Sequence, residues 1–289
     1  MDTEADEKLK EGMNNAPELS RRTSDQVQEF FSRFAHAKSA LLLLDYDGTL
    51  APFRVDRFKA RPWAGVRELL DRIQDTSGTG LKTRIAFISG RPAAEIGPLL
   101  GLKSPVEVWG LHGAERLHAD GRRELEEPPS PTREKLNELR VRLRRDSFGG
   151  LFEDKPNAVV MHWRGASDLK ARQIAEKSRE LFEPLSHLQG LKLLEFESGL
   201  ELRSGRDKGG AVEAILAGAT ESTMENPVAF LGDDITDEAA FVAVNANMRP
   251  HITALVKRVH RETAATVWLR PPGELRAFLR QWIAACSRS

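Results

Sequence analysis

Two acidic residues that follow a strongly apolar run are the residues in this sequence best suited to chemistry. Asp45 and Asp47 come directly after Leu41–Leu44, and Gly48 and Thr49 follow them. Residues i and i+2 of an extended segment point the same way, so both carboxylates can serve one site. Gly48 permits the tight backbone turn that must come next. Two carboxylates at the end of a buried strand predict a place for a metal ion and a phosphate.

Three later motifs also place polar residues at the boundaries of predicted elements, two at the ends of strands and one at the start of a helix. Ser89 follows a strand-like segment, and an acidic cluster beginning at Asp233 follows the apolar residues 228–231. Lys208 precedes two glycines and opens a helical pattern. Taken alone, each motif also has a structural interpretation: a turn after a core strand, a solvated lysine at a helix start, or a helix N-cap. Their order after Asp45 favours one shared functional site.

The elements that must position these residues follow from the apolar patterning. The four leucines fit a strand covered on both faces, as in parallel sheets. Strand patterns at 41–44, 85–88 and 106–109 alternate with helical patterns at 62–73 and 93–100. This alternation predicts a parallel sheet with right-handed crossovers. Ligands of such sheets bind outside the carboxyl ends of the strands, where the motifs fall.

The patterning changes after about residue 120. The segment 126–131 has the proline-rich composition of a linker. Beyond it, antiparallel strand patterns occur at 151–155, 158–163, 192–196 and 199–203, and helical patterns at 132–145 and 167–182. Core-like patterning returns at 228–231, with a helix over 239–243, a strand over 266–269 and a final helix over 273–286.

These patterns predict an α/β protein with a Rossmann-like parallel-sheet core and a smaller inserted α/β cap. We expect residues 25–120 and 204–289 to form the core and residues 121–203 to form the cap. Residues 1–24 are polar and mixed in charge, which predicts a mobile tail. A helix with an apolar face is expected to begin at Asp25.

Composition limits the classes of function. The 289 residues are 40% hydrophobic and 30% charged, with 43 basic and 43 acidic side chains, as in soluble globular proteins. No basic excess predicts nucleic-acid binding. The single cysteine, Cys286, excludes an internal disulfide, and no cysteine-histidine cluster predicts zinc. No apolar run is long enough to span a membrane, and the acidic start is unlike a secretory signal. We expect a monomeric, cytoplasmic protein.

The order of the four motifs resembles that of the haloacid-dehalogenase-like phosphotransferases. Further segments resemble the trehalose-6-phosphate phosphatases, and the resemblance spans about residues 40–270. The segments are Asp45–Pro52, Ser89–Arg91, Gly110–Glu115, Glu153–Lys155, His162–Arg164, Glu201–Arg203, Lys208–Gly209 and Gly232–Glu238. The resemblance implies hydrolysis of trehalose 6-phosphate to trehalose and phosphate, with a mobile cap closing over the disaccharide.

Phosphatase chemistry gives each core residue an expected role. Asp45 attacks phosphorus and becomes a transient aspartyl phosphate, while Asp47 is the general acid and base. Ser89 and Lys208 bind and neutralise the phosphoryl oxygens. A divalent cation, expected to be Mg²⁺, takes oxygen ligands from Asp45, the backbone carbonyl of Asp47 and Asp233. Asp237 is expected to hold a metal-bound water or to orient Lys208.

The resemblance also implies a set of substrate contacts. Thr49 is expected to contact the phosphate, and His112 and Glu115 to lie at the core rim facing the cap. Glu153, Lys155 and Glu201 are expected to bind sugar hydroxyls, because charged groups make strong hydrogen bonds to them. The remaining expected substrate-binding residues are Gly90, Arg91, Arg164 and Arg203. Pairing of Arg164 and Arg203 with the cap carboxylates is the alternative. Structural interpretations stay open, such as a charged hairpin corner at 153–155 and a polar turn around His112.

Two departures from the family pattern leave the substrate open. Ser204 and the segment Val55–Phe58 stand where the family commonly has proline. The substrate could therefore be a related sugar phosphate, such as glucosylglycerol phosphate or sucrose phosphate. A phosphomutase reaction is also open, as is a non-catalytic role as a sugar-phosphate sensor. Any trehalose-6-phosphate synthase that works with this chain is expected to be a separate protein.

Overall fold

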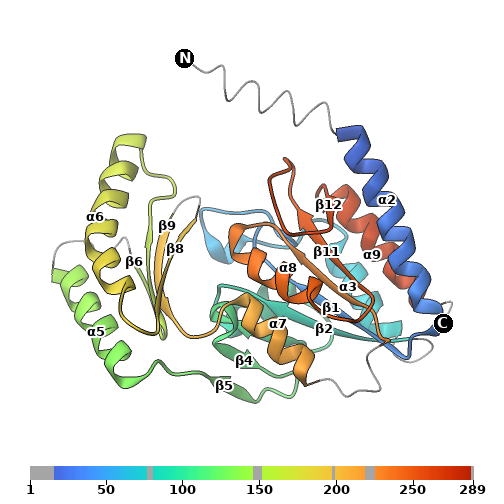
Figure 1. Cartoon of the computed structure of the whole chain (residues 1–289), viewed down its shortest axis with the longest axis horizontal. Helices are drawn as coiled ribbons and strands as arrows, with labels where there is room; N and C mark the ends of the chain where they lie inside the picture. Colours follow the sequence, from blue (N-terminus) through green and yellow to red (C-terminus); the bar gives the residue numbers. More distant parts are fainter. Residues whose placement is uncertain (1–15, 77–80, 146–151, 197–198, 219–224, 288–289) are drawn as a thin grey trace.

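The structure is a computed structural model that describes residues 16–76, 81–145, 152–196, 199–218 and 225–287. Figure 1 shows a large sheet flanked by helices and a smaller sheet with two helices of its own. The large sheet has the strand order β12-β11-β10-β1-β2-β3-β4-β5. Its parallel strands are β1 (Ser39–Leu44), β2 (Lys82–Ile88), β3 (Glu107–Gly110), β10 (Val228–Gly232), β11 (His251–Val256) and β12 (Val267–Leu269). The predicted α/β core is confirmed.

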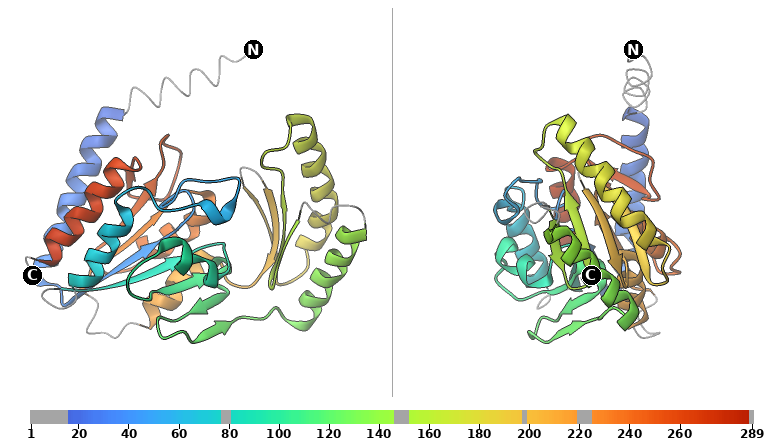
Figure 2. Two further views of the ribbon diagram at one scale, coloured as in Figure 1. Left: turned by 180° about the vertical axis from the view of Figure 1, so that it is seen from behind. Right: turned by 90° about the vertical axis from the view of Figure 1, so that its left-hand side faces the viewer.

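The leucines of β1 are buried on both sides of this sheet, as expected for a central parallel strand. Leu42 and Leu44 pack with the helices of one face, and Leu41 and Leu43 with those of the other. The first face carries α2 (Ala16–Ser32), α3 (Val66–Asp75), α4 (Ala93–Leu100) and α9 (Gly273–Cys286). The second face carries α7 (Lys208–Ala217) and α8 (Glu238–Asn245), and Figure 2 shows both layers from other sides.

The first described helix differs from the prediction at its start. α2 begins at Ala16, so residues 16–24 of the expected tail belong to the helix, and residues 1–15 lie outside the described residues. Phe30 of α2 packs against Phe278 of α9, and Phe34, in the 3-10 turn Arg33–His36 that follows α2, packs against Trp282 of α9. This aromatic contact holds the helix to the core, because aromatic side chains bury large apolar areas.

The edge of the core sheet extends further along the chain than expected. β4 (Glu115–Leu117) and β5 (Arg123–Leu125) add to β3 as antiparallel strands. The expected cap boundary at residue 121 is therefore too early, since β5 belongs to the core sheet. The strands were hard to anticipate because each has three residues and β5 is exposed throughout.

The smaller sheet has the order β6-β7-β9-β8 and is antiparallel throughout. Its strands are β6 (Phe152–Lys155), β7 (Ala158–His162), β8 (Leu191–Phe196) and β9 (Gly199–Ser204). The helices α5 (Ser130–Arg145) and α6 (Asp168–Ser186) pack on one face through a core that includes Leu136, Val159 and Phe182. The other face looks toward the large sheet (Figure 1). We call residues 130–204 the cap.

A search of the described helices for a segment that could cross a lipid bilayer found none with the necessary length and apolarity.

Candidate active site

A cavity of about 500 Å³ lies between the carboxyl ends of the core strands and the open face of the cap sheet. The core contributes acidic, hydroxyl and basic groups to its wall, and the cap contributes charged groups and His162. The core residues that we predicted and that line it are Asp45, Asp47, Ser89, Gly90, Arg91, His112, Lys208 and Asp233. The predicted cap residues that line it are Glu153, Lys155, Arg164 and Glu201. The four sequence motifs therefore meet in one place.

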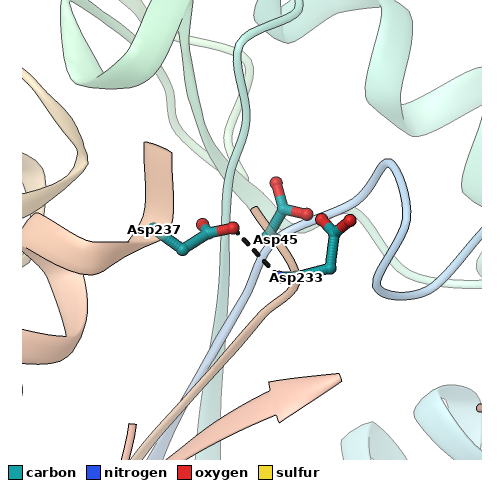
Figure 3. A group of neighbouring side chains, drawn as sticks. All are labelled: Asp45, Asp233 and Asp237. Atoms are coloured by element: carbon teal, nitrogen blue, oxygen red, sulfur yellow. Dashed lines mark hydrogen bonds between the residues drawn. The ribbon is translucent and has the colours of Figure 1, made fainter. Parts of the chain in front are cut away.

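Strand pairing brings the two main acidic motifs to the same level. β1 and β10 are parallel, with Leu44 opposite Leu231, so Asp45 and Asp233 emerge side by side (Figure 3). Gly48 has φ = 85°, and a Cβ added there would lie 2.0 Å from Asp233 Oδ2. Glycine adopts this left-handed backbone conformation readily and has no Cβ to collide with the carboxylate of Asp233. Both properties explain why glycine stands at this position of the first motif.

Lys208 joins the acidic residues at the base of the cavity. Its Nζ donates hydrogen bonds of 2.7 Å to Asp45 Oδ1 and 2.7 Å to Asp237 Oδ1. The other oxygen of Asp237 accepts from the backbone amides of Asp233 and Asp234, each at 3.0 Å. Both oxygens of Asp237 are thus engaged, and of its two expected roles this geometry supports the orientation of Lys208.

The charges at this base are buried and affect one another. Burial, opposed in part by Lys208, raises the pKa of Asp45 from 3.8 to about 7. Burial and the neighbouring carboxylates raise the pKa of Asp233 well above its ordinary value. Burial alone would lower the pKa of Lys208, but the charges of Asp237 and Asp45 outweigh it and raise that pKa. The ammonium group therefore stays charged, while the two acids ionise at a cost unless another cation joins them.

The same groups have the chemistry of a site for a hard divalent cation. Carboxylate oxygens of Asp45, Asp233 and Asp237 lie within 4.8 Å of one another. Asp233 Oδ1 is buried and has no hydrogen-bond partner among the described residues. An unpartnered buried carboxylate oxygen is costly in a protein interior, and coordination to a cation would satisfy it. The residues present fit Mg²⁺, with Asp45 and Asp233 as the side chains that would hold it.

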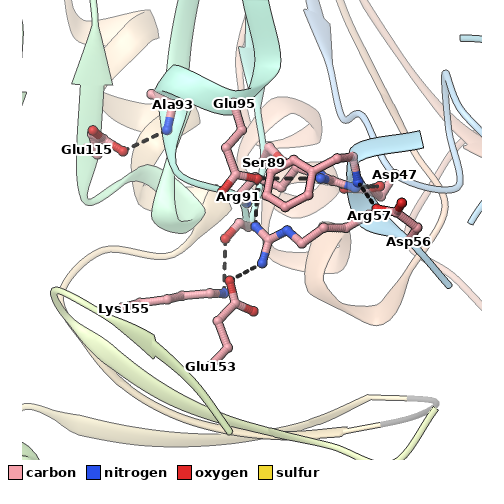
Figure 4. A network of polar contacts seen from close by, with 12 residues as sticks. Asp47, Asp56, Arg57, Ser89, Arg91, Ala93, Glu95, Glu115, Glu153 and Lys155 are labelled. Carbon is pink, nitrogen blue, oxygen red and sulfur yellow. Dashed lines mark hydrogen bonds and ion pairs between the residues drawn. The ribbon is translucent and has the colours of Figure 1, made fainter. Parts of the chain in front are cut away.

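Asp47 also lines the cavity and is held by Arg91. Arg91 Nε donates to Asp47 Oδ2 at 2.5 Å, and its Nη2 donates to Oδ1 at 2.6 Å (Figure 4). A bidentate pair of this kind fixes the plane of a carboxylate as well as its position. Ser89 is buried beside it, and its Oγ accepts from the backbone amide of Arg91 at 3.2 Å.

Two contacts join the cap to the core directly above these residues. Lys155 Nζ donates to Gly90 O at 3.0 Å and to Glu201 Oε1 at 3.2 Å. Glu201 Oε2 lies 3.1 Å from His112 Nε2. A Cβ at Gly90 would lie 2.7 Å from the His112 ring, so the glycine makes room for the histidine.

The protonation of this group follows from its burial. Burial lowers the pKa of His112 to about 4 despite the carboxylate of Glu201, so the ring is neutral near pH 7. Its Nε2 must then carry the proton in order to donate to Glu201. Burial by itself would raise the pKa of Glu201, but the Lys155 ammonium holds it well below its usual value. Glu201 is an ionised acceptor.

Alternation along the strands explains which cap residues face the cavity. Glu153 of β6, Val160 of β7 and Glu201 of β9 are opposite one another in the pairing register. Their neighbours Val159 and Leu202 pack on the helices instead. Because successive strand residues point to opposite faces, a two-residue spacing places Glu153 and Lys155 on the same side. Glu153, Lys155 and Glu201 therefore lie together on the cavity side of the cap sheet.

Sequence reasoning missed Arg57, which lies in the core segment that departs from the family pattern. It forms ion pairs with Glu153 of the cap and with Glu95 of the core, the latter at 2.8 Å. Glu153 is also 3.0 Å from His162 Nε2. Although burial would raise the pKa of Glu153, its partners His162, Lys155 and Arg57 lower it to about 2. Only the position of Arg57 soon after the first motif hinted at a role.

Four further predicted residues differ in their surroundings. Thr49 is buried and donates to Asp45 Oδ2 at 2.9 Å. Glu115 accepts from the Ala93 amide at 2.7 Å and from Arg123. Arg203 is buried, and its Nε and Nη1 have no hydrogen-bond partner among the described residues. Arg164 lines the cavity, with its guanidinium 4.7 Å from the centre of the Phe53 ring. Direct contact of these four with a substrate stays a prediction.

Comparison with known proteins identifies the family. A family model described as Trehalose-phosphatase matches residues 43–270, well over half of the chain. The chain is 28% identical over 248 residues to the trehalose-phosphate phosphatase of Mycolicibacterium paratuberculosis. This match covers 82% of the chain and 60% of that protein, so the chain spans about three fifths of the relative's length.

Two solved structures share the fold. The C-terminal domain of C. albicans trehalose-6-phosphate phosphatase superposes with a TM-score of 0.73 at 22% identity, covering 90% of this chain and 96% of that one. A haloacid dehalogenase-like hydrolase from Bacteroides thetaiotaomicron superposes with a TM-score of 0.59 at 18% identity, covering 84% and 99%. The predicted fold, a Rossmann-like core of the haloacid-dehalogenase type with a cap, is therefore confirmed. Together with the family match over residues 43–270, it establishes that this chain belongs to the trehalose-phosphatase family.

Proposed function

We propose that the protein is a Mg²⁺-dependent phosphatase that hydrolyses trehalose 6-phosphate to trehalose and phosphate. The observation that carries this proposal is the complete set of buried groups at the base of the cavity, in which Lys208 bridges Asp45 and Asp237 beside Asp233. Membership of the trehalose-phosphatase family supports the substrate. The charged cap face, with Glu153, supports recognition of a polyhydroxylated group.

In the first step, an oxygen of Asp45 attacks phosphorus and the bond from phosphorus to the sugar oxygen breaks. Asp47 gives a proton to that leaving oxygen, so trehalose leaves as a neutral alcohol. Lys208 balances negative charge beside Asp45, and Ser89 donates a hydrogen bond to a phosphoryl oxygen. The bidentate contact of Asp47 with Arg91 gives the acid–base group a fixed position near Asp45.

In the second step, water attacks the phosphorus of the aspartyl phosphate, and Asp47 takes the proton of that water. Inorganic phosphate leaves, and the carboxylate of Asp45 is restored. Asp45, Asp233 and the backbone carbonyl of Asp47 are the proposed holders of Mg²⁺. When bound, the ion supplies positive charge that reduces repulsion between an anionic nucleophile and an anionic phosphate.

Other sugar phosphates are the second candidate substrates, because Ser204 and Val55–Phe58 depart from the family pattern. A panel of trehalose 6-phosphate, sucrose 6-phosphate, glucosylglycerol phosphate and glucose 6-phosphate, assayed for phosphate release, tests the substrate. Trehalose 6-phosphate is expected to have the highest kcat/KM. A higher value for another ester would reassign the substrate, and no release from any would favour a non-catalytic sensor.

Replacement of Glu153 by alanine is expected to affect the sugar substrate selectively. The carboxylate faces the cavity from the cap and stays ionised, so it can bind sugar hydroxyls that help to close the cap. We expect kcat/KM for trehalose 6-phosphate to fall about tenfold or more, roughly 1.4 kcal/mol. The activity on p-nitrophenyl phosphate should change far less. Equal losses on both esters would show that Glu153 acts on folding or on a step that both esters share instead.

Thermal stability provides a test of the metal site that does not depend on turnover. In the folded protein the pKa of Asp45 is raised from 3.8 to about 7, so the metal-free protein loses this contribution to stability as pH rises through that range. A bound cation replaces the proton. The increase in Tm on adding Mg²⁺ should therefore be larger at pH 8 than at pH 5, by on the order of a few degrees.

Asp233→Asn is the matched control for this measurement, since it removes the charge of a proposed ligand without changing its size. The variant should show a smaller Mg²⁺-induced shift at pH 8. An increase in Tm that is the same at both pH values, or that persists in the variant, would mean that Mg²⁺ binds elsewhere.

A further inference from the structure

A chain of alternating charges runs from the cap to the acid–base carboxylate. Glu153 of the cap pairs with Arg57, whose Nη2 is 2.8 Å from Glu95 Oε2. The same oxygen of Glu95 lies 3.5 Å from Arg91 Nη1. Arg91 uses its other nitrogens, Nε and Nη2, to hold Asp47 (Figure 4). Arg57 and Glu95 have no role in the steps proposed above, yet they lie in the middle of this series of ion pairs.

We infer that Arg57 and Glu95 are positioning residues, which fix the carboxylate of Asp47 through Arg91 and tie its position to that of Glu153 in the cap. The inference rests on the proposed function, because it takes Asp47 as the group that protonates the leaving oxygen. It adds two residues and a route by which cap closure and proton transfer are coupled.

The burial of these side chains supports a positioning role. The Arg91 side chain is only 8% exposed, so its guanidinium is restricted to the partners that surround it. The side chains of Arg57 and Glu95 are 32% and 23% exposed. Two contacts, Asp47 on one edge and Glu95 on the other, define the plane of the Arg91 guanidinium. A carboxylate that must deliver a proton along a narrow direction depends on such secondary support.

This series of ion pairs also allows the position of the cap to affect the position of Asp47 without any movement of the core strands. Glu153 reaches Arg57 only when β6 lies over the core segment 57–59, as it does here. If cap closure strengthens the hold on Arg57, then a well-placed Asp47 must in turn favour the closed cap, because coupling between two sites is reciprocal. Arg57 is suited to this position because one planar guanidinium can pair with two carboxylates at once.

Two small esters that offer the cap no sugar hydroxyls separate proton donation from sugar recognition. n-Butyl phosphate releases an alkoxide that needs a proton, whereas p-nitrophenyl phosphate releases a stable phenolate that does not. We expect the ratio of kcat/KM for the butyl ester to that for the nitrophenyl ester to fall about tenfold in Arg57→Gln and in Glu95→Gln. Asp47→Asn sets the scale, with the largest fall in this ratio.

Arg61→Gln is the matched control. Arg61 donates to the carbonyl oxygens of Pro98 and Leu99, so it ties the same segment to the same helix α4, four residues away from Arg57. In Arg61→Gln, the ratio of kcat/KM for the butyl ester to that for the nitrophenyl ester should stay within about twofold of the wild-type ratio. Arg57→Lys keeps the charge without the forked geometry and should lose less than Arg57→Gln.

The double variant Arg57→Gln/Glu95→Gln tests whether the two residues act as one unit. If they do, its loss should be no greater than that of the more impaired single variant, instead of the product of the two losses. Glu153→Ala should lower the same ratio by about threefold if the cap takes part. An unchanged ratio in Glu153→Ala would refute the link to the cap.

Ratios in Arg57→Gln and Glu95→Gln that match Arg61→Gln, or losses that multiply in the double variant, would overturn the inference while leaving the proposed phosphatase intact. Wild-type protein that releases phosphate from neither ester nor from any sugar phosphate would refute the proposed function, and the inference with it. Circular dichroism melting of each variant distinguishes misplacement of Asp47 from loss of the fold.

Discussion

Replacement of Asp45 by asparagine is expected to abolish turnover while the fold survives. The carboxylate is buried at the end of β1, and an amide in its place cannot form an acyl phosphate. We expect kcat to fall at least about a hundredfold, a loss of more than ~2.7 kcal/mol of transition-state stabilisation. Phosphate release from trehalose 6-phosphate measures the change. With substrate that carries a radiolabelled phosphoryl group, the wild-type protein should become labelled and the variant should not.

Asp234→Asn is the control for this substitution. Asp234 lines the same cavity, but its side chain accepts from the Ile235 amide at the start of a 3-10 turn, a cap that asparagine can also provide. Its activity should stay close to that of wild type. Retention of more than about a hundredth of wild-type kcat by Asp45→Asn would remove Asp45 as the nucleophile.

The sequence predicted the core of the site because its chemistry is local to strand ends. Asp45 and Asp233 each follow a strand that is buried on both faces, and parallel pairing in register is enough to bring them together. Within the cap, the alternation of side chains along β6 places Glu153 and Lys155 on the side that lines the cavity. These are consequences of periodicity, which can be read along a single chain.

Contacts made by long side chains between distant segments could not be predicted in this way. Arg91 pairs with Asp47, and nothing in their spacing of 44 residues indicates that pair. Contact of Arg91 with a substrate stays a prediction. Arg57 reaches across to Glu153, 96 residues later, from a segment without periodic pattern. The short strands β4 and β5 were missed for a related reason, since three residues carry too little pattern to define a strand.

Removal of divalent cations is expected to abolish activity as completely as loss of Asp45. Burial raises the pKa of Asp45 and that of Asp233 in the protein alone, so ionisation of the two neighbouring acids is costly without a cation. An attacking carboxylate must be ionised, and an incoming phosphate adds further negative charge. Excess EDTA should therefore lower kcat at least about a hundredfold, and added Mg²⁺ should restore it.

The response to other cations and to a ligand variant makes this prediction specific. Mg²⁺ demands six ligands at short distances, whereas Ca²⁺ accepts more ligands at longer ones, so Ca²⁺ should occupy the site and inhibit. Asp233→Asn should need on the order of tenfold more Mg²⁺ for half-maximal activity, because the substitution removes the negative charge of a proposed ligand. In the wild-type protein, Oδ1 of this carboxylate has no other partner among the described residues. Full activity in excess EDTA would overturn the metal assignment, and Mg²⁺ dependence unchanged in Asp233→Asn would move the ion away from this carboxylate.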